Sequence, residues 1–207
     1  MPGPTATQPH NGRSGTRVEW GMENHPHGWL EVVCGPMFGG KSEELIRRLR
    51  RATIAKQKVM VFKPDIDTRY SVTNVASHNR TEFPAVPIPT GTEEHIYLEI
   101  QNENVQVVGI DEAQFFSSEI IDVCKTLANK GIRVIVAGLN QTSDGRPFGP
   151  MAELMASADE VTVLTAICTE CGAPATKSQR LAASNQTVEV GSGDKYAARC
   201  RSHFVPG

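Results

Sequence analysis

Short apolar runs rich in valine and isoleucine recur along the chain, and longer amphipathic segments separate them. Buried strands of a parallel sheet have this continuous apolar character because both of their faces are covered. The runs occupy residues 30–34, 59–62, 105–110, 134–137 and 161–164. Since helical patterns lie between them, the sequence predicts an α/β domain in which helices flank a mostly parallel sheet.

Two of the intervening segments carry a clear helical pattern. Over residues 42–56, apolar positions recur every three to four residues, and acidic and basic residues are spaced for i,i+4 pairs on the other side. Over residues 117–130 a similar pattern recurs, with Ser117 or Ser118 placed to cap the amino end and Gly131 to end the helix. In the first segment the face comprises Leu45, Ile46, Leu49 and Thr53, and the charged pairs are Glu43 with Arg47 and Glu44 with Arg48.

Changes in composition divide the chain into three parts. Residues 1–28 are rich in Gly, Pro, Thr, Asn and His and are expected to form a disordered leader. Residues 29–166 hold the strand and helix pattern, and residues 167–207 are expected to form a small separate domain. Within the main domain, the polar segments 64–89 and 140–150 are expected to be loops at the rim of the sheet.

Composition and charge narrow the class of protein. Hydrophobic residues make up 39% and charged residues 21% of the chain, which is ordinary for a globular protein. The formal net charge of −2 argues against non-specific binding to nucleic acid. No apolar run approaches the length of a membrane span, and the leader lacks an apolar signal-peptide core. A cytoplasmic protein that neither enters a membrane nor binds nucleic acid is therefore expected.

A glycine-rich stretch, CGPMFGGKS, follows the first predicted strand and precedes the first predicted helix. It fits G-x-x-x-x-G-K-S, in which backbone N–H groups and a helix amino end bind phosphate. Lys41 is then expected to reach the β- and γ-phosphates, and Ser42 to bind Mg²⁺. The alternative is a plain strand-to-helix turn with a surface lysine. The phosphate-binding residues predicted here are Gly35, Pro36, Met37, Phe38, Gly39, Gly40, Lys41 and Ser42.

Two acidic residues end the third predicted strand, in the sequence VVGIDE. Ligands of open α/β sheets collect at the carboxyl ends of the strands. Asp111 is therefore expected to hold Mg²⁺, and Glu112 to act as a general base toward water or a substrate hydroxyl. The alternative is an acid pair that only caps the following helix.

Three of the five cysteines gather near the carboxyl end, which indicates a metal site rather than disulfides. The spacing Cys-x-x-Cys followed by Cys-x-x-His offers three thiolates and one imidazole, a closed tetrahedral set for structural Zn²⁺. Two unrelated pairs of buried thiols are the alternative, and Cys34 and Cys124 are expected in the core. The predicted zinc ligands are Cys168, Cys171, Cys200 and His203.

Several motifs in a fixed order resemble one family. GPMFGGKSEELIRR, KPDIDTRY, GIDEAQFF, RPFGPM and the Cys-x-x-Cys, Cys-x-x-His pair closely resemble the zinc-containing (type II) thymidine kinases over residues 29–203. The resemblance implies a P-loop NTPase-like sheet with a small C-terminal zinc-ribbon domain that carries a lasso loop. It also implies transfer of the γ-phosphate of ATP to the 5′-hydroxyl of thymidine, giving dTMP for nucleotide salvage. A homotetramer inhibited by dTTP is part of the same expectation.

The resemblance also assigns residues that spacing alone does not identify. Arg69 matches an arginine that approaches the transferred phosphoryl group, and Phe115 and Phe148 match aromatic residues that line the thymine pocket. Residues 188–196 match the lasso loop, whose backbone hydrogen-bonds the pyrimidine edge. The substrate-binding residues implied in this segment are Val188, Val190, Gly193 and Tyr196.

One loop departs from the family pattern. Asn140, Ser143 and Asp144 stand where relatives commonly have aspartate, phenylalanine and arginine, and the missing ring is expected to loosen the nucleoside pocket. Two other functions share parts of the motif set. A nucleic-acid-dependent ATPase would bind DNA or RNA through the zinc ribbon. A nucleotide sensor would bind ATP without transferring phosphate.

Overall fold

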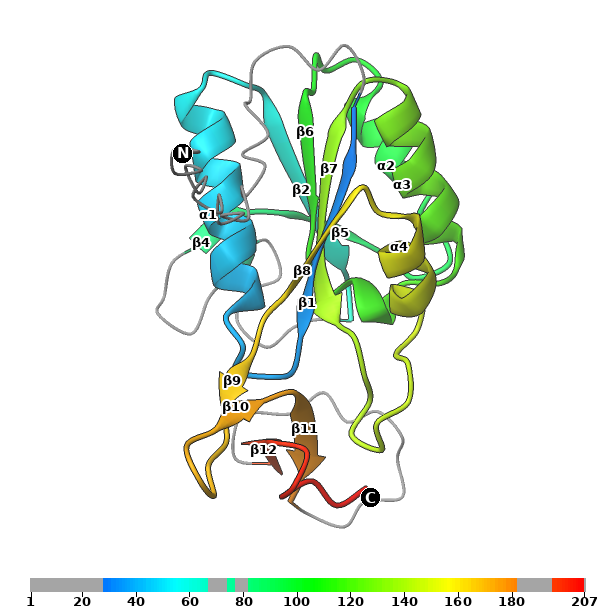
Figure 1. The fold of residues 1–207 in the computed structure, drawn as a ribbon. Helices are drawn as coiled ribbons and strands as arrows, with labels where there is room; N and C mark the ends of the chain where they lie inside the picture. Colours follow the sequence, from blue (N-terminus) through cyan, green and yellow to red (C-terminus); the bar gives the residue numbers. More distant parts are fainter. Residues whose placement is uncertain (1–27, 67–73, 77–81, 182–194, 207) are drawn as a thin grey trace, which may run out of the picture.

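A six-stranded sheet forms the centre of the protein (Figure 1). The computed structural model describes residues 28–66, 74–76, 82–181 and 195–206. All strand pairs in the central sheet are parallel, and the strand order is β5-β2-β6-β7-β1-β8. The strands are β1 (Leu30–Gly35), β2 (Val59–Pro64), β5 (Val86–Ile88), β6 (Val107–Ile110), β7 (Arg133–Leu139) and β8 (Glu160–Val163).

The five strands predicted from apolar runs all belong to this sheet, which confirms the α/β class. Strand β6 begins at Val107, two residues later than predicted, because Val105 lies before the first register pair of β6 with β2. The strand that the pattern does not indicate is β5. The middle one of its three residues is Pro87, and a proline is tolerated here because β5 lies at the edge of the sheet.

Helices cover both faces of the sheet (Figure 1). On one face lies α1 (Lys41–Ile54), whose buried Leu45, Ile46 and Leu49 pack in one hydrophobic cluster with residues of the strands. On the other face lie α2 (His95–Ile100), α3 (Glu119–Asn129) and α4 (Met151–Ser157). Helices α2 and α4 were not predicted, since six or seven residues are too short to show a helical period. Among the described residues, no helix is long and apolar enough to cross a membrane.

The ends of α3 follow the predicted signals. The Ser117 hydroxyl accepts a hydrogen bond from the Glu119 N–H group at 3.2 Å, next to the first turn. At the other end Gly131 adopts φ +88°, and its N–H group donates to the Ala128 carbonyl at 3.0 Å. A left-handed residue of this kind commonly ends a helix, and glycine adopts it without steric cost.

The described part of the segment expected to be a long loop, residues 64–89, contains three short strands. Besides β5 it forms an antiparallel pair of β3 (Asn74–Ala76) with β4 (Glu82–Pro84). Val75 is buried in the hydrophobic cluster on the α1 face. The prediction of a loop was therefore wrong for these residues, because Val75 reaches the core although the segment as a whole is rich in polar residues.

A small module follows β8 and lies beyond the carboxyl edge of the central sheet (Figure 1). It consists of two antiparallel pairs, β9 (Ala166–Ile167) with β10 (Pro174–Ala175), and β11 (Lys177–Arg180) with β12 (Tyr196–Arg199). Its buried cluster consists of small residues: Ala166, Cys168, Ala175, Ala198 and Cys200. The domain limits predicted at 28/29 and 166/167 stay predictions.

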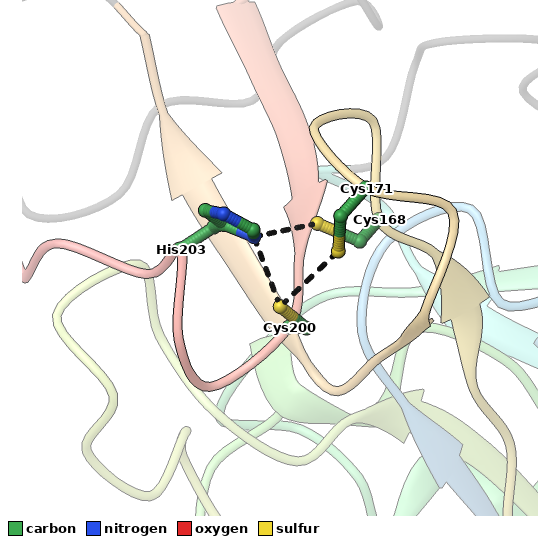
Figure 2. Close-up of side chains that lie close together, drawn as sticks. All are labelled: Cys168, Cys171, Cys200 and His203. Atoms are coloured by element: carbon green, nitrogen blue, oxygen red, sulfur yellow. Dashed lines mark hydrogen bonds between the residues drawn. The ribbon is translucent and has the colours of Figure 1, made fainter.

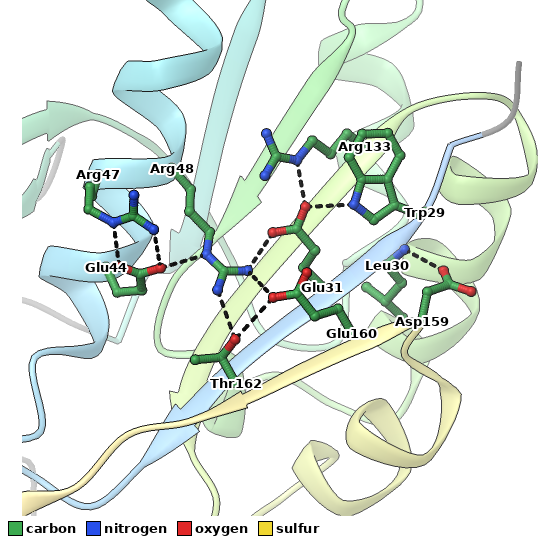
Figure 3. A network of polar contacts seen from close by, with 10 residues as sticks. All are labelled: Trp29, Leu30, Glu31, Glu44, Arg47, Arg48, Arg133, Asp159, Glu160 and Thr162. Atoms are coloured by element: carbon green, nitrogen blue, oxygen red, sulfur yellow. Dashed lines mark hydrogen bonds and ion pairs between the residues drawn. The ribbon is translucent and has the colours of Figure 1, made fainter. Parts of the chain in front are cut away.

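A buried ion network joins α1 to the sheet (Figure 3). Glu31 of β1 is 2% exposed and accepts hydrogen bonds from Arg48 at 2.5 Å and from Arg133 at 2.6 Å. Arg48 also donates to Thr162 at 2.8 Å and lies 3.2 Å from Glu160, both on β8. Burial alone would raise the pKa of Glu31, but Arg133 and Arg48 outweigh burial and hold the pKa below its ordinary value.

Candidate active site

The predicted phosphate loop connects the carboxyl end of β1 to the amino end of α1. Gly40 precedes the helix with φ +79°, a left-handed conformation that favours glycine, and its carbonyl accepts the Glu44 N–H group at 3.0 Å. The Lys41 ammonium group lies over the loop and donates to the Pro36 carbonyl at 2.8 Å. The loop therefore surrounds the start of α1, where backbone N–H groups and the helix dipole favour an anion.

Ser42 and Asp111 come together at the same edge of the sheet. The Ser42 hydroxyl donates to the two Asp111 carboxylate oxygens at 3.1 and 3.4 Å, across 69 residues of sequence. Asp111 follows β6 directly and is 6% exposed, so its carboxylate is held in place close to the loop. A hydroxyl and a carboxylate are oxygen ligands of the kind that Mg²⁺ prefers.

Glu112 adopts an unusual backbone conformation beside this pair. Its φ of 50° and ψ of 38° lie in the left-handed region, which a residue other than glycine rarely occupies. It precedes the short 3₁₀ helix η1 (Ala113–Phe115), and the Phe115 N–H group donates to its carbonyl at 3.1 Å. Gln114 donates its side-chain N–H to the Glu112 carboxylate. Strained residues of this kind occur preferentially at functional sites.

Phe115 and Phe148 form an aromatic pair next to the acidic residues. Their ring centroids are 5.5 Å apart and the rings meet edge to face at 87°. Phe115 ends η1, and Phe148 lies in the loop between β7 and α4. The segment around Phe115 is held by Thr90, whose hydroxyl donates to the Phe115 carbonyl at 3.1 Å, and by the buried Glu93, whose carboxylate accepts the Ser117 N–H at 2.7 Å.

The loop 140–150 folds back on itself between β7 and α4. Gln141 and Pro147 form a β-bridge, and the Thr142 N–H group donates to the Arg146 carbonyl at 2.9 Å. The Asp144 carboxylate accepts the Thr142 hydroxyl and lies 3.3 Å from the Arg146 guanidinium. The hydrogen bond from Thr142 lowers the pKa of Asp144 below its ordinary value. Asp144, one of the residues that depart from the family pattern, thus stabilises the turn of its own loop.

The four predicted zinc ligands converge in the C-terminal module (Figure 2). Their ligand atoms all lie within 4.8 Å of one another, with His203 presenting Nδ1 to the sulfur atoms. The Sγ atoms of Cys171 and Cys200 are 3.8 Å apart, and Nδ1 lies 3.3 Å from the Cys200 Sγ. A tetrahedral Zn²⁺ site has edges of about 3.8 Å between sulfurs and about 3.6 Å between sulfur and nitrogen. The cluster therefore fits a metal such as zinc.

The electrostatics of the cluster favour a thiolate at Cys168. Desolvation opposes the charged form, but hydrogen bonds from the backbone N–H groups of Cys200, Glu170 and Cys171 lower the pKa of Cys168 to about 6. A thiolate, not a thiol, is the form that binds metal. The remaining cysteines differ: Cys34 and Cys124 are fully buried, as predicted, and burial raises the pKa of Cys124 to about 12.

The metal module contacts the phosphate loop directly. The buried Ser178 of β11 accepts a hydrogen bond from the Met37 N–H group at 2.9 Å, across 141 residues of sequence. Next to it, the Lys177 ammonium group donates to the Gln141 side chain at 2.6 Å. The module therefore forms hydrogen bonds with both the phosphate loop and the loop that carries Phe148.

Comparisons with known proteins agree with this arrangement. A family model described as thymidine kinase matches residues 28–204. The chain belongs to the thymidine kinase family. A thymidine kinase from Rhodothermus sp. (strain ITI 518) is 54% identical over 179 residues, which cover 86% of this chain and 82% of that protein. A thymidine kinase from Bdellovibrio bacteriovorus (strain ATCC 15356 / DSM 50701 / NCIMB 9529 / HD100) is 49% identical over 182 residues, 88% of each chain.

Several residues that the thymidine kinase resemblance singles out lie outside the described residues. These are Arg69, Val188, Val190 and Gly193. Tyr196 is described: it begins β12, is 9% exposed and lies 5.8 Å from the Arg180 guanidinium, measured from ring centroid to Cζ. It packs in the module that holds the thiol cluster, at the end of the predicted lasso segment.

The sequence did not predict two polar residues that the structure brings to this candidate site. Gln114 lies within the motif GIDEAQFF, yet its spacing carries no signal of a contact with Glu112. Ser178 gives no signal either, because its contact with Met37 depends on how the module folds back over the sheet edge. Both residues are buried polar side chains, a property that only the tertiary structure reveals.

Proposed function

We propose that this protein is an ATP-dependent thymidine kinase, which transfers the γ-phosphate of ATP to the 5′-hydroxyl of thymidine to give dTMP. Membership in the thymidine kinase family supports this function. The observation that carries it is the meeting of the phosphate loop, Asp111 and Glu112 at one edge of the sheet. That edge can hold a triphosphate and a proton acceptor side by side.

In this proposal the phosphate loop binds ATP. Lys41 leaves the Pro36 carbonyl and binds the β- and γ-phosphates, while backbone N–H groups at the amino end of α1 bind phosphate oxygens. The Ser42 hydroxyl and the Asp111 carboxylate, already within hydrogen-bond distance, hold Mg²⁺. When bound, Mg²⁺ offsets the negative charge of the phosphate oxygens. Arg69 is proposed to stabilise the transferred phosphoryl group.

Glu112 is the proposed general base. As the 5′-oxygen of thymidine forms its bond to the γ-phosphorus, the bond from that phosphorus to the β–γ bridging oxygen breaks and ADP leaves. The hydroxyl proton passes to the Glu112 carboxylate, so the step conserves charge and atoms.

The nucleoside is proposed to bind beside the aromatic pair. Phe115 and Phe148 offer an apolar wall for thymine and its methyl group. Residues of the predicted lasso would contact the pyrimidine edge, among them Val188, Val190, Gly193 and Tyr196. The Cys168, Cys171, Cys200 and His203 cluster is proposed to bind structural Zn²⁺ and so to hold both ends of this segment.

One assay tests the proposed function against its rivals. Purified protein is incubated with ATP, Mg²⁺ and each nucleoside in turn, and the products are separated by chromatography. We expect dTMP and ADP in equal amounts. Phosphate release that requires DNA or RNA would favour a nucleic-acid-dependent ATPase, and the absence of any turnover would favour a nucleotide sensor.

Three further properties remain predictions of the family resemblance. They are the homotetramer, inhibition by dTTP and the cytoplasmic location. Light scattering of the purified protein tests the first, and a titration of dTTP into the kinase assay tests the second.

A further inference from the structure

Gln114 is a buried side chain with two hydrogen bonds to the candidate active site. It lies in η1 and is 2% exposed. Its Oε1 atom accepts the N–H group of Leu139, the last residue of β7, at 2.9 Å. Its Nε2 atom donates to Oε2 of Glu112. The carboxamide therefore links the Glu112 carboxylate to the backbone of the neighbouring strand.

The two partners determine which way the amide points. The Leu139 N–H group is only a donor, so the atom facing it must be the amide oxygen. A carboxylate oxygen accepts hydrogen bonds, so the atom facing Glu112 must be the amide nitrogen. Both requirements select the same orientation. A flipped amide would place oxygen against oxygen at Glu112 and N–H against N–H at Leu139.

Two glycines provide the space that Gln114 occupies. A Cβ atom added at Gly138 would lie 2.8 Å from the Gln114 Oε1 atom. A Cβ atom added at Gly149 would lie 2.3 Å from the Gln114 backbone carbonyl oxygen, and Gly149 also adopts φ +50°. Both distances are below ordinary van der Waals contact. The surroundings therefore hold the backbone and the side chain of Gln114 in one position.

We infer that Gln114 is a positioning residue, which holds the Glu112 carboxylate aimed for proton transfer. The inference rests on the proposed function, because it assumes that Glu112 is the base. One carboxylate oxygen held by a buried amide limits rotation of the whole carboxylate group.

Replacing the amide with a carboxylate of the same shape tests the inference. In Gln114→Glu the Leu139 N–H group keeps an acceptor, but Glu112 loses its donor and faces a second negative charge. The two adjacent carboxylates repel each other, so Glu112 is no longer held by its partner. We expect kcat at pH 7 to fall about 10- to 100-fold, with the KM for ATP nearly unchanged.

The matched control is Gln106→Glu, the same change at an exposed position just before the amino end of β6. It should leave kcat and the KM for ATP unaltered. Gln114→Met serves as a second variant, since it removes the donor without adding charge, and should lower kcat while ATP binding persists. Thermal unfolding of each variant establishes that it is folded.

The outcomes separate the inference from the proposed function. If Glu112→Gln is slow while folded Gln114→Glu and Gln114→Met keep the wild-type kcat, the inference is overturned and the base remains. If Glu112→Gln keeps full turnover, the base assignment fails and the inference fails with it. A slow Glu112→Gln together with a lowered kcat and an unchanged KM for ATP in Gln114→Glu supports both.

Discussion

Glu112 occupies a backbone conformation that costs a residue other than glycine about 1–3 kcal/mol. It persists because neighbouring groups hold it: the Phe115 N–H group binds its carbonyl and the Gln114 amide binds its carboxylate. Asp111, one residue earlier, instead faces the Ser42 hydroxyl. Two adjacent acids thus point to two different partners, which is what separate roles in metal binding and proton transfer require.

Glu112→Gln should keep ATP binding while kcat for thymidine falls by about 10² to 10⁴ fold, since the amide cannot accept the hydroxyl proton. Nucleotide binding is measured by calorimetry and turnover by product chromatography. Glu119→Gln, an exposed residue at the start of α3, is the control and should retain wild-type turnover. Weakened ATP binding in Glu112→Gln with unchanged kcat would instead assign Glu112 to the nucleotide site.

Helix α1 connects the phosphate loop to the rest of the sheet. Its first residue is Lys41, and two turns later Arg48 makes ion pairs with Glu31 of β1 and with Glu44 of the helix itself. Because Arg48 also contacts β8, the helix is held at one angle to the two strands. The position of the phosphate loop at the start of α1 depends on this attachment.

Arg48→Ala should lower the free energy of unfolding by roughly 3 kcal/mol, because it removes a partner of the buried Glu31 carboxylate. Arg47→Ala is the matched control. Its side chain is 58% exposed and pairs with the same Glu44, so we expect a change of about 1 kcal/mol or less. Urea denaturation measures both. Equal losses in the two variants would mean that burial of the network contributes nothing to its effect.

Low pH should reduce the free energy of unfolding, in part because Glu44 becomes protonated. Its hydrogen bond with Arg47, and then Arg48, lowers the pKa of Glu44 from 4.5 to about 2. A carboxylate whose pKa is lowered by folding stabilises the fold above its unfolded pKa and loses this effect as pH falls toward the folded pKa. Between pH 4.5 and 2, Glu44→Gln should therefore show a shallower fall in unfolding free energy than the wild type. Parallel curves in urea titrations would contradict the assignment.

At the scale of the whole molecule, the module that holds the thiol cluster is connected to the phosphate loop by direct contacts. Ser178 and Lys177 of β11 contact the phosphate loop and the loop that carries Phe148. The hydrophobic cluster around the thiols of the module consists of alanine and cysteine residues, so a bound metal would supply much of its stability. Metal binding in the module should therefore affect a site that the metal does not touch.

Cys171→Ser should lose bound zinc, lower the thermal unfolding temperature and raise the KM for both ATP and thymidine. Zinc is measured by atomic absorption on the purified protein. Cys124→Ala alters a buried cysteine of the main core, leaves all four ligands intact and should keep one zinc per chain. Full zinc content in Cys171→Ser would show that the cluster is not the metal site.

Ser178→Ala removes the acceptor of the Met37 N–H group and leaves the metal ligands in place. The KM for ATP should rise about two- to tenfold, in line with the loss of one hydrogen bond, while zinc content stays unchanged. Ser118→Ala, an exposed serine before α3, should have no effect on this KM. A KM for ATP equal to that of the wild type would show that the module does not support the phosphate loop.

The sequence by itself determined the features that depend on nearby residues. The apolar runs of β1, β2, β6, β7 and β8, the period of α1 and α3 and the glycines around Lys41 all express local conformational preferences. The spacing of the four metal ligands is equally local within each Cys-x-x pair, and the structure brings the two pairs together as predicted.

Only the tertiary structure decided which strands are neighbours, and so what surrounds the acids. Because β7 lies between β6 and β1, the Leu139 N–H group is available to Gln114 and, through it, to Glu112. The same applies to β5 at the sheet edge and to Ser178 against Met37. Strand order and long-range contacts are set by how all elements bury their apolar faces together, and no short segment of sequence carries that information.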